Sequence, residues 1–356
     1  NVSPLAVYRH AAKADSVQQR RPNVVLIMME SMSAKFMKHF GQSETLTPFL
    51  DSLYTRSISF RNFYSAGIHT NHGLYATLYS FPAMMKRNLM KGSVIPRYSG
   101  LPTVLKENGY YNLFFMTHEG QYDNMNAFFR TNGYDEVFSQ ENYPADKVVN
   151  SFGVQDDFLY DYAIPVLNQR AATGQPFFAT LLSISNHPPY VIPPFFHPKT
   201  SEPEMQIVEY ADWALRQFFE EARKQPWFDN TIFVLEGDHG KLVGDAECEL
   251  PESYNHIPLM IYSSRIQPEE KTAFGGQVDI QPTILGLLNI DYLQNNFGVD
   301  LLKEERPCMF YTADNMVVGR NDTLLYLYNY ETQQELTYDI GNGKLNAVPM
   351  DDSFLP

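Results

Sequence analysis

The chain has 356 residues, of which 44% are hydrophobic, so it is long enough to bury a large core as one α/β domain or two smaller ones. Its formal net charge is -14 with no basic stripe to offset it, which excludes nucleic acid as a partner, although a bound cation would still admit a small anionic substrate. Its two cysteines, Cys248 and Cys308, are too few for a disulfide framework or a cysteine-based zinc site.

Strand-like apolar runs alternate with helix-like segments from Arg21 onward, which predicts a mostly parallel central sheet with helices on both faces. The expected strands are Val24–Met29, Tyr111–Thr117, Phe177–Ser185, the run from Thr231 to Asp238, and Ile257–Tyr262. The expected helices are Thr47–Tyr54, Leu101–Asn108, Val154–Arg170, Tyr210–Lys224 and Asp279–Leu288.

Beyond about Asn289 the pattern changes to short strand-like pieces separated by Asn, Asp and Gly, which predicts a small antiparallel β meander packed on the main sheet. We therefore divide the chain into an N-terminal extension (1–21), an α/β core (22–288) and a small C-terminal α+β subdomain (289–356). The opening residues are polar and do not begin with Met, as in a processed protein or an excised domain. No apolar run reaches the roughly 18 residues that a membrane-spanning helix needs.

Four of the expected strands end in residues with metal-binding or acid/base chemistry. Glu30 follows the first strand, His118 the second, His187 the third, and Asp238 with His239 the fourth. Because ligands bind outside the carboxyl ends of the strands in open α/β sheets, we expect one site assembled from these side chains. Two carboxylates and an imidazole, from Glu30, Asp238 and His239, suit Mn²⁺ or Mg²⁺ and tolerate Zn²⁺.

The candidate nucleophile is Thr70, in the segment Ser65–Thr77, where a glycine-bearing loop leads into a helix that begins close to the threonine. Backbone N–H groups at a helix N-terminus bind phosphate, and a hydroxyl there can attack it. Metal coordination would lower the pKa of that hydroxyl. Structural alternatives remain open, with Thr70 as a helix cap, Glu30 as a neighbour of a cap, and His187 as part of a rigid turn before two prolines.

Taken in order, these segments resemble the alkaline phosphatase and sulfatase superfamily, and within it the lipoteichoic acid synthase-like phosphoglycerol transferases. The resemblance runs from about Asn23 to about Leu302 and implies an alkaline phosphatase-like fold with a sulfatase-type catalytic core. The motifs that carry it are Pro22–Ser31, Gly67–Gly73, Phe152–Asp156, Ser185–Tyr190, Tyr210–Ala214, Asp229–Gly240 and Val278–Thr283.

The resemblance implies one divalent cation, Mn²⁺ with Mg²⁺ or Zn²⁺ as alternatives, and a covalent phospho-threonine-type intermediate. The implied metal ligands are Glu30, Thr70, Asp238 and His239. The implied catalytic residues are Thr70 and His187, and the implied substrate-binding residues are His118, His187 and Asn124. Neither cysteine lies in the element that sulfatases convert to formylglycine, and a second set of zinc ligands is not found, so a single-metal threonine enzyme fits best.

One position departs from the resemblance. The family often has an Asn-Arg pair whose arginine grips phosphate, whereas this chain has Asn124 followed by Met125. The residues that could take over that positive charge are Arg130, His69 and His72.

The implied function is a phosphoglycerol transferase with a phosphatidylglycerol-like lipid as donor and a glycan or glycerol phosphate as possible acceptor. The alternatives are a phosphate or sulfate ester hydrolase of the same superfamily and a non-catalytic ectodomain that binds an anion or a glycan. Retention of Thr70 argues against the last alternative, because a binding module does not need a nucleophile. We also expect an extracytoplasmic location, with membrane anchoring through a region absent from this chain.

Overall fold

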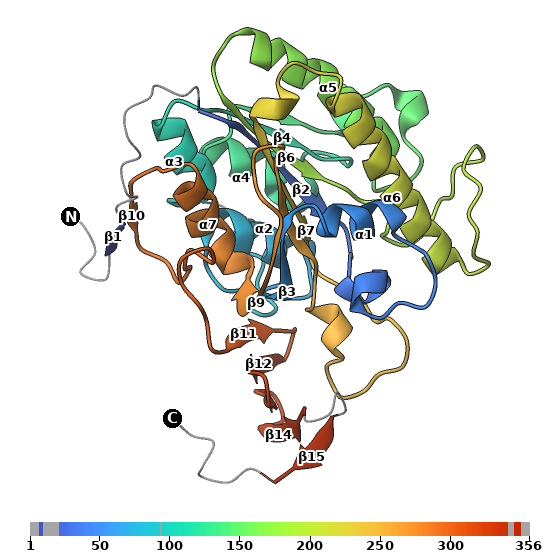
Figure 1. Cartoon of the computed structure of the whole chain (residues 1–356), viewed down its shortest axis with the longest axis vertical. Coiled ribbons are helices and arrows are strands. Elements are labelled where there is room, and N and C mark those ends of the chain that lie inside the picture. The colour runs from blue at the N-terminus through green and yellow to red at the C-terminus, as the bar shows by residue number, and fades with distance from the viewer. Residues whose placement is uncertain (1–6, 10–20, 93, 341–344, 350–356) are drawn as a thin grey trace.

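A computed structural model describes residues 7–9, 21–92, 94–340 and 345–349 of the chain. An eight-stranded sheet lies between two layers of helices, and a separate five-stranded sheet lies beside it toward the C-terminus (Figure 1). The predicted fold class, a mostly parallel sheet with helices on both faces plus a small antiparallel sheet, is therefore confirmed.

The large sheet consists of β2 (Asn23–Met29), β3 (Ile58–Tyr64), β4 (Tyr111–Phe115), β5 (Glu136–Phe138), β6 (Phe177–Leu182), β7 (Thr231–Gly237), β8 (Leu259–Tyr262) and β9 (Glu269–Gly276). Their order across the sheet is β5-β4-β6-β2-β7-β8-β3-β9. Strand β8 is antiparallel to its neighbours β7 and β3, and the other pairings are parallel.

Strand β2 shows why the sheet needs a helix layer on each face, because all seven of its residues are buried. Val24 and Leu26 enter the hydrophobic core on the side of α2, α3, α4 and α7, whereas Val25 and Ile27 enter the core on the side of α1, α5 and α6 (Figure 1). The helices are α1 (Pro48–Tyr54), α2 (Thr70–Tyr79), α3 (Leu101–Glu107), α4 (Met125–Thr131), α5 (Asp156–Ala172), α6 (Pro203–Ala222) and α7 (Ile280–Leu287). Short 3₁₀ turns occur at Ala34–Phe36, Lys38–Phe40, Tyr122–Asn124, Gln140–Asn142, Ala145–Lys147, Phe228–Asn230, Glu252–Tyr254 and Gln277–Asp279.

Three strands of the large sheet were not predicted, β3, β5 and β9. Strand β5 has only three residues, and β3 and β9 lack a clean hydrophobic pattern. In β3 the apolar residues are interrupted by Arg61 and Asn62, at the point where the register with β9 shifts. Strand β9 forms the edge of the sheet and begins with exposed charged residues. Helix α6 also begins at Pro203 instead of the predicted Tyr210, with the proline in the first turn, where its missing N–H costs no hydrogen bond.

The five-stranded sheet is a meander of β11 (Met309–Thr312), β12 (Met316–Arg320), β13 (Leu324–Asn329), β14 (Gln334–Asp339) and β15 (Asn346–Val348). It packs on the main body through a separate hydrophobic core, in which the Tyr311 ring stacks on the Tyr64 ring with centroids 5.2 Å apart. Every regular element described beyond α7 is a strand.

Most of the predicted N-terminal extension lies outside the described residues. Its described part, β1 (Val7–Arg9), pairs antiparallel with β10 (Tyr292–Gln294). Among the helices of the described residues, none combines the length and the apolarity that crossing a bilayer requires.

Candidate active site

The strands that precede the candidate residues are direct neighbours in the sheet. Strands β4, β6, β2 and β7 are adjacent and parallel, so their carboxyl ends lie at the same end of the sheet. His118, His187, Glu30 and Asp238 follow these strands in that order across the sheet. The four strand ends therefore lie side by side in the sheet.

Glu30, Asp238 and His239 form a compact cluster in which one ligand atom from each lies within 4.8 Å of the others. His239 Nε2 is 3.7 Å from Glu30 Oε1 and 3.6 Å from Asp238 Oδ2. His239 Nδ1 lies 2.7 Å from the Gly240 carbonyl oxygen, so the ring proton belongs on Nδ1. The lone pair of Nε2 therefore faces the two carboxylates, as metal ligation requires.

The charge balance of this cluster fits a divalent cation. Burial, followed by the repulsion from Asp238, raises the pKa of Glu30 well above its usual range. Asp238 Oδ2 is buried and has no hydrogen-bond partner within the described residues. In a dry interior, two carboxylates with no protein cation between them repel each other, and a carboxylate oxygen without a hydrogen bond costs free energy. A bound cation offsets both costs. The hard oxygen and imidazole donors match the expected Mn²⁺ or Mg²⁺ and are compatible with Zn²⁺.

The two carboxylates are held by the backbone around Ser31. Asp238 Oδ1 accepts hydrogen bonds from the N–H groups of Ser31 at 2.8 Å and His239 at 2.7 Å, while Ser31 Oγ donates to Glu30 Oε1 at 2.7 Å. Ser31 has a φ of 50°, a left-handed conformation that costs a non-glycine residue about 1–3 kcal/mol. These hydrogen bonds hold the strained turn in place.

Thr70 is the first residue of α2, and its Oγ1 lies 3.4 Å from Glu30 Oε2. Helix α2 reaches this position because Gly73 packs directly on the end of β7. A Cβ at Gly73 would lie 2.2 Å from the Asp238 carbonyl oxygen, so a side chain there would push the helix away. The structure thus brings the predicted nucleophile next to the predicted metal ligands.

A row of aromatic rings connects the two predicted substrate histidines. The His118 ring lies 4.6 Å from that of Tyr122, Tyr122 lies 6.3 Å from Phe152, and Phe152 lies 4.1 Å from His187. Nδ1 of His118 and of His187 each lies close to a backbone carbonyl oxygen, so Nδ1 of each ring is a hydrogen-bond donor and Nε2 is left for the substrate. Burial lowers the pKa of His118, so this imidazole is neutral at neutral pH.

Asn124 and Arg130 have partners away from the carboxylate cluster. Asn124 Nδ2 donates to the Met90 carbonyl oxygen at 3.0 Å, and Arg130 Nε donates to Asn126 Oδ1 at 2.8 Å on an exposed face of α4. Among the described residues, neither side chain contacts Glu30 or its neighbours in the cluster. Arg130 therefore does not replace the arginine that the resemblance led us to expect.

His69 and His72 do not supply a free positive charge either. His69 Nε2 lies 2.7 Å from Oδ1 of Asp314, a residue of the C-terminal subdomain, so any charge on this ring is already paired. Burial, followed by the proximity of His69, lowers the pKa of His72 to about 4, so its ring is neutral at neutral pH.

Sequence reasoning missed three polar residues that build the surroundings of the cluster. Gln277 donates from Nε2 to the Asp238 carbonyl oxygen at 2.7 Å and accepts from the Ala66 N–H at 2.9 Å, which ties β7 to the loop before Thr70. Asn186 and Lys241 lie between the ends of β6 and β7. The sequence signal for Asn186 was its place inside the motif Ser185–Tyr190, and the signal for Lys241 was its place directly after the motif Asp229–Gly240.

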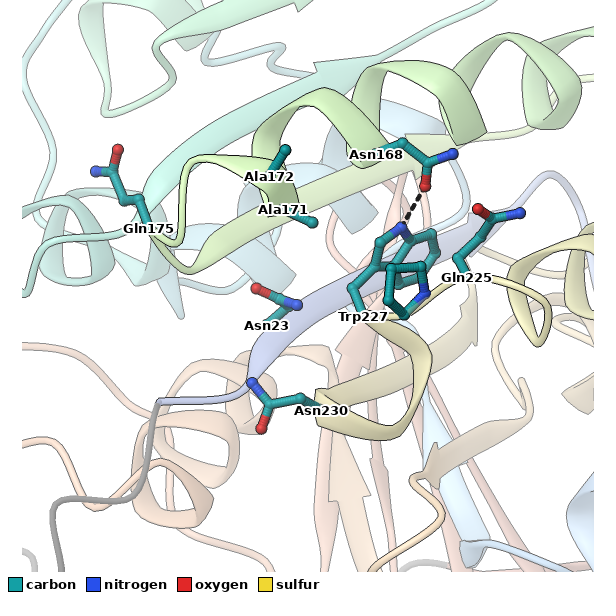
Figure 2. A pocket seen from close by; sticks show the side chains of 9 residues that line it. Asn23, Asn168, Ala171, Ala172, Gln175, Gln225, Trp227 and Asn230 are labelled. Carbon is teal, nitrogen blue, oxygen red and sulfur yellow. Dashed lines mark hydrogen bonds between the residues drawn. The ribbon is translucent and has the colours of Figure 1, made fainter.

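A cavity of about 320 Å³ lies at the opposite end of the sheet, near the amino ends of β2, β6 and β7 (Figure 2). Amide side chains dominate its lining, and the Trp227 indole N–H donates to Asn168 Oδ1 at 2.6 Å. Its lining has no titratable side chain, so it offers no metal ligand, acid or base. This cavity therefore offers no alternative to the candidate site at the carboxyl ends of the strands.

Comparison with known proteins gives a family match and several relatives. A family model described as Sulfatase matches residues 22–290. The chain is 24% identical over 315 residues to lipoteichoic acid synthase 2 of Bacillus subtilis, covering 80% of this chain and 47% of that protein. It is 26% identical over 323 residues to phosphoglycerol transferase I of Xanthomonas campestris, covering 85% of this chain and 46% of that protein. The chain thus spans about half the length of these relatives.

Solved structures share the fold over nearly the whole chain. A protein of the alkaline phosphatase superfamily from Vibrio parahaemolyticus superposes with a TM-score of 0.87 at 29% identity, covering 98% of this chain and 86% of that one. The lipoteichoic acid synthase LtaP from Listeria monocytogenes gives a TM-score of 0.81 at 20% identity, covering 94% of this chain and 88% of that one. The fold is therefore alkaline phosphatase-like.

Proposed function

The chain belongs to the sulfatase family, and from this premise we propose that it is a metal-dependent phosphoglycerol transferase with Thr70 as its nucleophile. The observation that carries the proposal is the Thr70 hydroxyl at 3.4 Å from Glu30, at the rim of the cluster that Glu30 forms with Asp238 and His239. A hydroxyl beside a cation site at a helix N-terminus is suited to attack phosphorus.

The relatives support this reaction class, because they include lipoteichoic acid synthases and a phosphoglycerol transferase. We take a phosphatidylglycerol-like lipid as the donor and a glycan or glycerol phosphate as the acceptor. A lipid donor places the site at a membrane surface, and in these relatives about half of the protein lies outside the matched region. We therefore include in the proposal a membrane anchor outside this chain and an extracytoplasmic location.

The first half of the reaction transfers the glycerophosphoryl group to the protein. Thr70 Oγ1 attacks the phosphorus of the donor in line, the Oγ1–P bond forms, and the bond between phosphorus and the diacylglycerol oxygen breaks. The threonine proton passes to solvent water, and the departing alcohol oxygen takes up a proton from His187, which solvent then reprotonates. A divalent cation held by Glu30, Asp238, His239 and Thr70 would supply a lowered hydroxyl pKa and neutralise charge on the phosphate oxygens.

The second half regenerates the threonine. An acceptor hydroxyl attacks the same phosphorus, the Oγ1–P bond breaks, and Thr70 recovers its proton while the acceptor gains the glycerophosphoryl group. With water as the acceptor the same steps give hydrolysis, so transferase and hydrolase differ only in which hydroxyl reaches the phosphorus.

We assign to His187 the transfer of a proton to the leaving oxygen. We assign to His118 a hydrogen bond to the substrate from a neutral ring. Replacing His187 with glutamine is expected to lower kcat by about 10²- to 10⁴-fold, because an amide cannot donate a proton to the leaving alcohol. Metal content is expected to stay at the wild-type level. His39→Gln is the matched control, since His39 lies at the surface beside Glu270, 2.9 Å from its Oε1. A His187→Gln enzyme as active as the His39→Gln enzyme would refute this role.

A panel of three substrates tests the proposed function. The metal-loaded protein is expected to release diacylglycerol from phosphatidylglycerol vesicles and to leave nitrophenyl sulfate intact. Rapid cleavage of nitrophenyl sulfate with no release of diacylglycerol would favour a sulfate ester hydrolase, and rapid cleavage of nitrophenyl phosphate alone would favour a phosphatase. No turnover of any of the three, with metal bound, would favour the non-catalytic binding ectodomain.

A further inference from the structure

Lys241 lies on the segment that leaves β7, two residues after His239. Its Nζ donates to Asn186 Oδ1 at 2.7 Å and to the Tyr190 hydroxyl at 3.0 Å. Both partners belong to the loop that follows β6, on either side of His187. The ammonium group therefore links the segments that follow β6 and β7, the two strands that flank β2, at the end of the sheet that carries the proposed active site.

Asn186 links this ammonium group to the carboxylate cluster. Its Nδ2 donates to the carbonyl oxygens of Glu30 at 3.2 Å and Ser31 at 3.1 Å, so its Oδ1 is turned toward Lys241. Asn186 is only 1% exposed, and these hydrogen bonds fix its orientation. Lys241 is thus held in one place relative to Glu30, as a group that binds substrate must be.

Lys241 makes no direct ion pair within the described residues, and the carboxylates of Glu204 and Glu30 act on its ammonium group only from beyond ion-pairing distance. Its hydrogen-bond partners are both uncharged, and the described residues contain no ion pair of this side chain. The faces of the Phe36 and Tyr190 rings lie 5.4 and 4.7 Å from Nζ. An ammonium group has three N–H donors, and two are used here. A half-buried ammonium group with a spare donor and no direct ion pair is suited to receive an anion.

We propose that Lys241 binds the anionic phosphate group of the substrate through its remaining N–H donor. This inference rests on the proposed function, because it assigns a phosphodiester anion to the same site. Two carboxylates line the cluster, so a fixed cation beside them helps to offset their repulsion of a phosphate. In this role Lys241 supplies the positive charge that the family resemblance implies for an arginine after Asn124, where this chain has the buried Met125.

The test compares Lys241→Met and Lys241→Arg in the metal-loaded protein, with inorganic phosphate as the probe in calorimetry. Methionine keeps the length of the side chain and removes its charge, so the affinity for phosphate is expected to fall by on the order of 10- to 100-fold. The KM for phosphatidylglycerol is expected to rise by a similar factor with kcat changed less than about threefold, because the lost contact is a binding contact. Lys241→Arg is expected to recover most of the affinity.

Lys35→Met is the matched control, because Lys35 is a more exposed lysine with a carboxylate partner, 3.7 Å from Glu247. It is expected to bind phosphate as the wild type does. The proposal is overturned if the wild-type protein does not bind phosphate, or if Lys241→Met binds it with unchanged affinity. A loss in kcat alone, with KM and phosphate affinity unchanged, would mean that Lys241 only holds Asn186 in place.

A second measurement uses the wild-type protein, in case Lys241→Met does not fold. Lysines are acetylated with and without saturating phosphate, and the modified peptides are quantified by mass spectrometry. Phosphate is expected to protect Lys241 and to leave Lys35 unaffected, and equal labelling of Lys241 in both samples would overturn the proposal. Phosphate protection without release of diacylglycerol would instead reject the proposed donor and leave the assignment of Lys241 intact.

Discussion

Replacing Thr70 with alanine is expected to lower turnover of phosphatidylglycerol by on the order of 10⁴-fold or more, because the reaction loses the atom that attacks phosphorus. The fold is expected to persist, since Thr70 is partly exposed and the cluster keeps its other three ligands. Diacylglycerol release by metal-loaded protein measures the effect, and thermal unfolding reports on the fold.

The chemical signature of the same step is a covalent adduct on the wild-type protein. Incubation with donor and no acceptor is expected to add the mass of one glycerophosphoryl group to the peptide that contains Thr70. Thr70→Ser is the matched control, because it restores a hydroxyl on the same backbone and is expected to recover measurable turnover and the adduct. Turnover by Thr70→Ala at the wild-type rate, or an adduct on another residue, would remove Thr70 as the nucleophile.

The gathering of the strand ends at one end of the sheet was open to prediction, because it depends on local sequence and one general rule. Each of β2, β4, β6 and β7 is a mostly apolar run followed by a polar or titratable residue, and parallel strands place their ligand-binding ends together. Strands β3 and β9 were not predicted, because Arg61 and Asn62 interrupt the apolar pattern of β3 and β9 starts with exposed charged residues. Their place in the sheet is decided by tertiary pairing.

The groups around the cluster could not be read from local patterns, because their partners are distant in sequence. Gln277 accepts a hydrogen bond from the N–H of Ala66, 211 positions away, and Lys241 pairs with Asn186 across 55 positions. The left-handed conformation of Ser31 could not be predicted, because no glycine marks the position and a hydrogen bond from its N–H to the distant Asp238 holds it in place. A single sequence shows the residue types of a site, whereas the folded chain shows which atoms face one another.

Replacing Asp238 with asparagine is expected to abolish metal binding and, with it, turnover. Asparagine keeps an oxygen to accept the N–H groups of Ser31 and His239, but an NH₂ group takes the place of the unpartnered Oδ2. That group cannot ligate a cation. Elemental analysis is expected to show about one divalent ion per wild-type chain and none in the variant, and the loss of turnover is expected to be on the order of 10³-fold or more, as after chelation of the wild-type metal.

The same variant separates the cost of the metal-free cluster from a general loss of fold. Without metal, Asp238→Asn is expected to be at least as stable as the wild type in thermal unfolding, because it removes the repulsion between Asp238 and Glu30 that raises the Glu30 pKa. With metal added, only the wild type gains stability, because a ligand that binds the native state alone stabilises it. Glu236→Gln is the matched control, since Glu236 is buried in β7, two residues before Asp238, and accepts a hydrogen bond from Thr77 Oγ1 at 2.6 Å, outside the cluster. Full metal content in Asp238→Asn, or its loss in Glu236→Gln, would contradict this assignment of the ligands.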